Sequence, residues 1–227
     1  MTLTHGTLHA TIARYFLDYG TAPTIARLSA LLALDRDTVS TALKALAEYH
    51  GVVLHPTSCE IWAMHPFSAA PTSFWVESEG RGWWGNCAWC SLGIAALLHR
   101  DATITTTLGG ESEQVVLRIR DGAIAPADYR VHFPIPMARA WDNVTYTCSM
   151  MLVFASEAAV DAWCLRHAMP RGDVQSVATV WAFAQAWYGR HLDPAWTKWT
   201  TAEARGLFAR FGLTGPTWEL PTHDERF

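Results

Sequence analysis

The stretch GWWGNCAWCSLGIAALLHR, from Gly82 to Arg100, is the most informative part of this chain for its fold. Its second half is rich in Leu and Ala and predicts a helix over residues 88–99, with Cys87 and Cys90 within one turn at its start. The positive end of the helix dipole favours a thiolate over a thiol, which makes sulfur a better nucleophile and metal ligand. We therefore expect reactive thiols here.

The sequence after this helix predicts antiparallel strands. Residues 103–107 and 114–120 alternate in polarity like paired strands, and Gly109 and Gly110 between them suit a turn. Further strands are expected at residues 129–133 and 149–154, and further helices at 157–167, 174–191 and 202–211. Residues 85–227 are therefore predicted to form a mixed α/β domain of antiparallel strands with flanking helices, so that the fold class is α+β.

Residues 1–65 predict a winged-helix-like N-terminal domain. Leucine and valine recur at three- and four-residue intervals through two segments, and Asp35 or Asp37 is placed to cap a helix over residues 38–49. Gly51 ends that helix, and the β-rich runs GVVLH and CEIWAM then resemble a wing. Residues 66–84 are rich in Pro, Ser, Gly and aromatic residues and are predicted to be a connector with one strand.

Charge argues against nucleic acid as a partner. Residues 1–50 contain four Lys or Arg and four Asp or Glu, whereas a module that reads DNA would be basic. The whole chain has a formal net charge of −4, which also argues against an anionic membrane. DNA binding and membrane binding are therefore not expected, and a homodimer is left open.

Composition indicates a folded protein with a large interior. Of 227 residues, 50% are hydrophobic and only 17% are charged, and the chain contains 12 Trp, which suits a deep core or a dry pocket. The N-terminus has no signal-peptide pattern, and no apolar run reaches the ~18 residues of a spanning helix. We therefore expect a cytoplasmic location.

The five cysteines leave several kinds of chemistry open. An odd number does not suit a disulfide framework. The pair Cys87 and Cys90 has no second Cys-x-x-Cys to complete a structural zinc site, and the βαβ pattern of thioredoxin-like proteins is missing around it. Two ordinary buried cysteines are the alternative.

The order of motifs resembles that of the alkylmercury lyases, also called organomercurial lyases. That family has a cysteine that opens a helix, a hairpin after this helix, and a second cysteine before a strand that ends Phe-Ala-Ser. The matching residues are Cys87-Ala88-Trp89-Cys90-Ser91-Leu92, Ala96-Leu97-Leu98-His99-Arg100, Cys148, Phe154-Ala155-Ser156 and Arg190-His191-Leu192. The resemblance extends over residues 24–192 and leaves residues 193–227 unassigned.

The resemblance implies roles for three cysteines. Cys87 would attack the metal, and Cys148 would be its partner thiol at the start of a strand. Cys90 stands where the family has an Asp that relays a proton to the carbon. A thiol titrates near ~8.5 and a carboxylate near ~4, so Cys90 could deliver a proton at neutral pH or act as a third sulfur ligand. All three sulfurs are also the expected metal ligands.

The implied substrate is a small organometallic compound, with Hg(II) or another soft metal bound as substrate or product and no cofactor required. Trp83, Trp84 and Trp89 would wall a dry pocket for the organic group, with core packing as their alternative role. Cys59 and Cys164 are expected to lie outside the site.

These residues together predict a lyase that cleaves a carbon–mercury bond by thiolate attack and protonolysis. Two other functions stay open. One is a non-catalytic thiol protein that binds or senses metal, which the Cys90 substitution favours. The other is a divergent thiol enzyme that acts on a non-mercury substrate.

Overall fold

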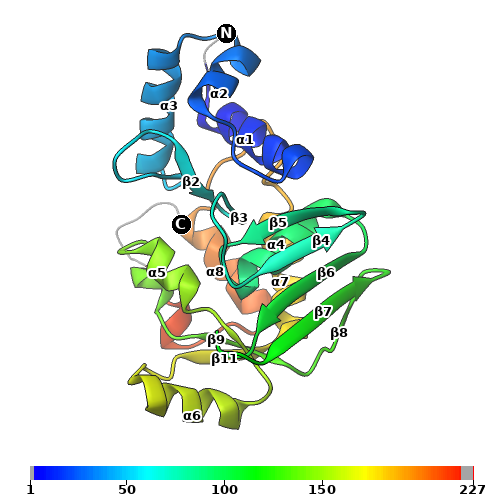
Figure 1. Cartoon of the computed structure of the whole chain (residues 1–227). Helices are drawn as coiled ribbons and strands as arrows, with labels where there is room; N and C mark the ends of the chain where they lie inside the picture. Colours follow the sequence, from blue (N-terminus) through cyan, green and yellow to red (C-terminus); the bar gives the residue numbers. More distant parts are fainter. Residues whose placement is uncertain (1–2, 221–226) are drawn as a thin grey trace.

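A computed structural model describes residues 3–220 and residue 227. Three helices form one end of the molecule, a large twisted sheet lies below them, and a second, smaller sheet lies at the opposite end (Figure 1). All strand pairs within both sheets are antiparallel, and helices pack beside them. The predicted α+β class is confirmed.

The N-terminal end consists of three capped helices and a hairpin. The helices are α1 (His5–Tyr19), α2 (Ile25–Leu32) and α3 (Arg36–Glu48), and the hairpin joins β1 (Val53–Leu54) to β2 (Ile61–Met64). Asp35 caps α3 by accepting a hydrogen bond from the Thr38 backbone N–H at 2.8 Å. The predicted helix and its cap are therefore confirmed, while the division of the chain into domains stays a prediction.

The large sheet has the strand order β1-β2-β3-β5-β4-β6-β7-β8. Its other strands are β3 (Phe67–Ser68), β4 (Trp75–Ser78), β5 (Arg81–Gly85), β6 (Ala102–Thr107), β7 (Gln114–Arg120) and β8 (Ala123–Ala125). Residues 66–84, expected to connect domains with one strand, hold β3, β4 and most of β5. The turn between β4 and β5 is tight because Glu79 and Gly80 both have positive φ.

The small sheet has the order β10-β9-β11, and α6 (Glu157–His167) packs near it (Figure 1). Its strands are β9 (Arg130–Phe133), β10 (Val153–Phe154) and β11 (Asp173–Ser176). The strand expected at residues 149–154 keeps only its last two residues. The preceding segment forms the short helix α5 (Val144–Ser149), so Cys148 lies in a helix and not at the start of a strand.

The helix α4 (Ala88–Leu98) forms the centre of the core. It is apolar on all sides, as a helix must be when sheet and helices surround it, and every residue from Ala88 to Leu97 is buried. It packs against α7 (Val177–Tyr188), and α8 (Thr201–Arg210) packs on α7 in turn. A Cβ at Gly93 would lie 2.4 Å from the Tyr188 ring, so only glycine allows this close approach.

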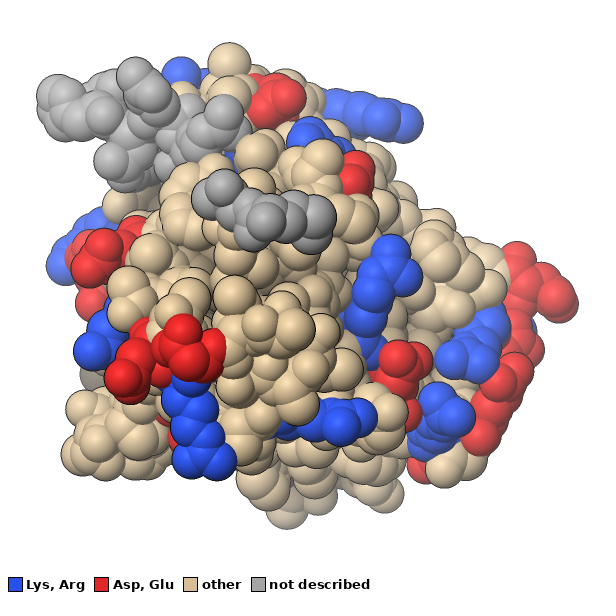
Figure 2. Space-filling model, turned by 90° about the horizontal axis from the view of Figure 1, so that it is seen from above, with Lys and Arg blue, Asp and Glu red and all other residues tan. Residues whose placement is uncertain are grey.

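No helix in residues 3–220 has the length and apolar character needed to cross a membrane. On the face over the N-terminal helices, Lys and Arg side chains lie among Asp and Glu, with a broad uncharged area between them (Figure 2). The described part of this face therefore does not gather positive charge in the way that a phosphate backbone would require.

Candidate thiol site

Two of the thiols lie at the beginning of α4. Cys87 is the N-cap residue, and its Sγ accepts a hydrogen bond from the Cys90 backbone N–H at 3.2 Å. Cys87 is 0% exposed and Cys90 is 1% exposed. The expectation that both cysteines lie within the first turn of a helix is therefore correct. Both side chains are fully buried, although the start of a helix is often exposed.

Cys148 joins these two thiols from α5. Side-chain hydrogen bonds connect it to Cys87 and to Cys90, so the three predicted cysteines form one cluster. Two further side chains contact this cluster. The Nε2 atom of His65 lies 3.3 Å from the Cys148 Sγ, and the Tyr188 hydroxyl lies 3.5 Å from the Cys90 Sγ.

The three thiols differ in how readily they ionise. Burial raises the pKa of Cys87, and hydrogen bonding to Cys87 and Cys90 raises the pKa of Cys148. Burial also opposes ionisation of Cys90, but hydrogen bonds from Cys148 and Cys87 and the positive charge available at His65 outweigh it and lower the pKa of Cys90. The lowered pKa makes Cys90 the thiol of the three that ionises most readily. The family resemblance implied Cys87 as the attacking thiolate, and that role stays a prediction.

The Tyr188 hydroxyl supports this distribution of charge. Burial raises the pKa of Tyr188 well above its ordinary value, and the neighbouring Cys90 raises it further. The phenol therefore keeps its proton and donates its hydrogen bond to the Cys90 sulfur. A charge-assisted hydrogen bond of this kind is stronger than one between neutral groups.

The cluster opens on a cavity of about 90 Å³ with a mostly apolar wall. Cys87, Cys90, Cys148 and His65 all contribute to the wall. The large aromatic side chains of the wall are Trp89, Trp141, Trp187, Tyr188, Trp196, Trp199 and Phe227. Such a wall excludes water from the thiols and suits a small apolar group.

The three tryptophans expected around the substrate are not all in this wall. Trp89 contributes to it and stacks on Phe183 at 4.8 Å between ring centroids. Trp83 instead points to the N-terminal helices, where its Nε1 donates to the Phe16 carbonyl at 2.7 Å. Trp84 packs on Trp75 across the strand pair β4 and β5. Trp83 and Trp84 therefore contact other parts of the fold and are not among the residues that line this cavity.

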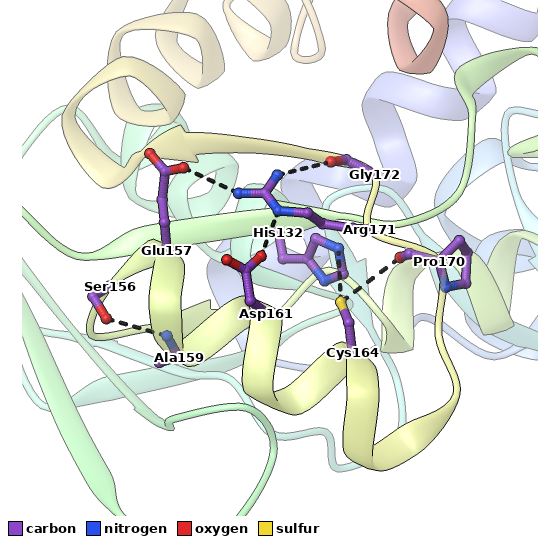
Figure 3. A network of polar contacts seen from close by, with 9 residues as sticks. All are labelled: His132, Ser156, Glu157, Ala159, Asp161, Cys164, Pro170, Arg171 and Gly172. Atoms are coloured by element: carbon purple, nitrogen blue, oxygen red, sulfur yellow. Dashed lines mark hydrogen bonds and ion pairs between the residues drawn. The ribbon is translucent and has the colours of Figure 1, made fainter.

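The two remaining cysteines lie apart from the three clustered thiols. Cys59 is half-buried in the loop that joins β1 to β2. Cys164 lies on α6, with its Sγ 3.8 Å from the His132 Nε2 and 3.8 Å from the Pro170 carbonyl (Figure 3). Burial raises the pKa of Cys164, so this thiol is kept protonated.

Comparisons with known proteins identify the family to which this chain belongs. The sequence model of the MerB alkylmercury lyase family matches residues 67–189, which is more than half of the chain. This chain belongs to the alkylmercury lyase family. The matched region contains Cys87, Cys90, Cys148 and Tyr188, while His65 lies just before it.

Solved structures support the alkylmercury lyase fold. Ten chains match, among them the crystal structure of the mercury-bound form of MerB2, with a TM-score of 0.64 and 20% sequence identity. The match covers 81% of this chain and 91% of that chain. No curated protein matches in sequence. At this identity the structural likeness concerns the fold.

Sequence reasoning missed two residues of this candidate site. His65 lies 83 residues from Cys148, and Tyr188 lies 98 residues from Cys90. Neither separation corresponds to a helical or strand repeat, so only the folded chain brings these side chains to the sulfurs. The sole local signal at His65 is the Pro that follows it, and the bond between them is cis.

Proposed function

We propose that the chain cleaves the carbon–mercury bond of small organomercurials by protonolysis, with Cys87, Cys90 and Cys148 as its catalytic residues. The observation that carries this proposal is the cluster of three buried, mutually hydrogen-bonded thiols beside an apolar cavity. Mercury(II) is a soft ion that prefers sulfur. The cavity is suited to the organic group, with Trp89 in its wall.

The different pKa values of the three thiols support a particular order of steps. The substrate enters as R–Hg⁺ and binds a thiolate, for which Cys90 is the favoured first sulfur because its pKa is lowered. The thiol of Cys87 then binds mercury as the second sulfur and gives up the proton that its raised pKa had kept on it. That proton bonds to carbon as the carbon–mercury bond breaks, which releases R–H. Hg(II) stays on two sulfurs, and the third thiol keeps its proton.

A cysteine at position 90 changes the source of the proton. The family has a carboxylate here, which is mostly ionised at neutral pH and acts as a relay, whereas thiols with raised pKa values hold their protons until mercury displaces them. The Tyr188 hydroxyl donates to Cys90 and stabilises its charge before substrate binds. Proton delivery would then depend on metal binding, which couples the two events.

The test is single-turnover release of hydrocarbon from an arylmercury or methylmercury compound by the reduced protein, with excess small thiol. The wild type is expected to release R–H, and Cys87→Ser to abolish release. Cys90→Asp restores the family residue and leaves Cys87 and Cys148 as the two sulfur ligands. This variant is expected to release R–H faster. The matched control is Cys164→Ser, which removes a buried thiol outside the cluster and should leave the rate unchanged.

Stoichiometric mercury binding without release of R–H by the wild type would contradict the proposed lyase activity. It would instead support the second candidate function, a thiol protein that captures metal without turnover. The observation that favours this candidate is the departure at Cys90, which gives the site a third sulfur. Slower release by Cys90→Asp than by the wild type would show that the thiol serves the reaction better than a carboxylate does.

A further inference from the structure

The thiol cluster contains a nitrogen donor that is not a mercury ligand in the proposed cleavage. The His65 Nε2 lies 3.3 Å from the Cys148 Sγ, and the donor atoms of His65, Cys90 and Cys148 all lie within 4.8 Å of one another. Cys87 completes the group, since it is hydrogen-bonded to both Cys90 and Cys148. Three donors therefore lie together as one group, and a fourth, the Cys87 sulfur, lies beside two of them.

This donor set differs from the one that mercury needs. Hg(II) is satisfied by two or three thiolates, so His65 adds little to its binding. Zinc prefers four ligands in a tetrahedron, and three cysteines with one histidine form one of its usual closed sites. We propose that Cys87, Cys90, Cys148 and His65 form a Zn²⁺ site that overlaps the thiols of the proposed lyase.

The spacing of the donor atoms suits zinc. With a Zn–S bond of about 2.3 Å and a Zn–N bond of about 2.05 Å, a tetrahedron places sulfur and nitrogen about 3.6 Å apart and two sulfurs about 3.8 Å apart. The distance of 3.3 Å between His65 Nε2 and Cys148 Sγ is close to the first value. The other separations among His65, Cys90 and Cys148, of up to 4.8 Å, and the approach of the neighbouring Cys87 sulfur need side-chain rotations to close around an ion.

The elements that hold these donors are fixed independently of any metal. The backbone N–H of Cys90 orients the Cys87 sulfur at 3.2 Å, and α4 is buried along most of its length. The His65 ring lies edge-on to Trp141 at 5.6 Å between centroids. A site whose donors are preorganised loses less conformational entropy when the ion binds.

Zinc in this site would compete with the organomercurial, because both need the same sulfurs. This competition rests on the proposed lyase function, whereas zinc binding does not. Zn²⁺ would then occupy the thiols until a softer metal displaces it, and would shield them from oxidation in the meantime.

The test measures zinc binding in the absence of any mercurial. The reduced full chain is titrated with Zn²⁺ against a chromophoric chelator, and X-ray absorption at the zinc edge counts the ligands. The expected result is one ion per chain with three sulfur neighbours and one nitrogen neighbour. His65→Gln is expected to weaken zinc affinity about tenfold or more while Hg(II) affinity stays unchanged.

The matched control is His132→Gln, which removes a buried histidine that also lies beside a thiol, at 3.8 Å from the Cys164 Sγ. Its zinc affinity should equal that of the wild type. The proposal is overturned if the wild type binds no zinc, if the spectrum contains sulfur alone, or if His65→Gln binds zinc as tightly as the wild type. The spectrum uses wild-type protein, so it decides the ligand set even if His65→Gln misfolds.

The competition has its own readout. Preincubation with Zn²⁺ should slow hydrocarbon release, and a chelator should restore it. If the protein releases no hydrocarbon under any condition but binds zinc through His65, the lyase proposal fails and the zinc site stands. If release is unaffected by saturating zinc, the two sites do not overlap and this part of the proposal is wrong.

Discussion

Acid is expected to destabilise this protein through buried histidines, of which His132 offers the cleanest test. His132 on β9 is 0% exposed, and its Nδ1 has no hydrogen-bond partner within residues 3–220 and 227. Burial, aided by the positive charge of Arg171, lowers its pKa from 6.5 to about 4. The unfolded chain therefore binds a proton at a higher pH than the folded protein does.

The sign and size of the effect follow from this difference. Stability from the neutral imidazole is present above pH 6.5 and is lost as the pH falls from 6.5 towards 4. The difference between the two pKa values corresponds to about 3 kcal/mol in all, of which about 2 kcal/mol would be lost between pH 7 and pH 5. His132→Gln removes the titrating group. Between pH 7 and pH 5 its unfolding free energy should therefore fall by about 2 kcal/mol less than that of the wild type.

The assay is urea unfolding of wild type and variant at pH 7 and pH 5. Only the change in unfolding free energy with pH is compared, because the substitution alters packing at both values. Cys164→Ser is the matched control, since it removes the sulfur beside His132 but keeps the imidazole, and its pH dependence should equal that of the wild type (Figure 3). Equal pH dependence in wild type and His132→Gln would refute the reasoning.

Two further substitutions test the packing and charge around the thiols. Gly93→Ala would bring a Cβ to 2.4 Å from the Tyr188 ring and should reduce the unfolding free energy by about 1–3 kcal/mol in urea melts. The control is Gly206→Ala, in open space on α8, which should raise the unfolding free energy by about 0.5–1 kcal/mol. Equal effects of the two substitutions would contradict the close approach at Gly93. Tyr188→Phe removes the donor to the Cys90 sulfur and should raise the pKa of that thiol, measured by thiolate absorbance against pH. An unchanged midpoint would show that the phenol does not stabilise the charge.

The sequence was sufficient for elements whose local pattern and tertiary environment agree. The helix α4 could be predicted because an unbroken apolar run follows a cysteine that can cap it. The strands β6 and β7 alternate in burial as they do in polarity. The cluster of Cys87, Cys90 and Cys148 was also predicted, but from the family resemblance and not from spacing.

The helix α5 shows why other parts could not be predicted. Its sequence VTYTCS is rich in β-branched and aromatic residues, which favour strands. Its helical form depends on contacts outside the pattern, because Asn143 caps its first turn and the Thr147 hydroxyl donates to the Ala140 carbonyl at 3.0 Å. Tertiary contacts outweighed local propensity here. Cys148 therefore lies in α5, the element before β10, and not at the start of the strand as expected.

The charge distribution among the thiols was equally beyond the sequence. The helix dipole acts similarly on Cys87 and Cys90, so local reasoning gave no basis for separating them. The difference between their pKa values arises from Cys148, His65 and Tyr188, all of which are distant in the chain.

The wall of the cavity includes His9 from α1, whose ring stacks on Trp196 at 3.6 Å between centroids. The segment that carries the reactive sulfurs therefore does not by itself determine which organic groups fit. A hybrid that exchanged residues 1–65 with those of a relative would inherit part of the relative's pocket. A substitution in α1 that changes the pocket therefore alters the environment of the segment around Trp196. We expect these two distant stretches to covary in sequence across the family.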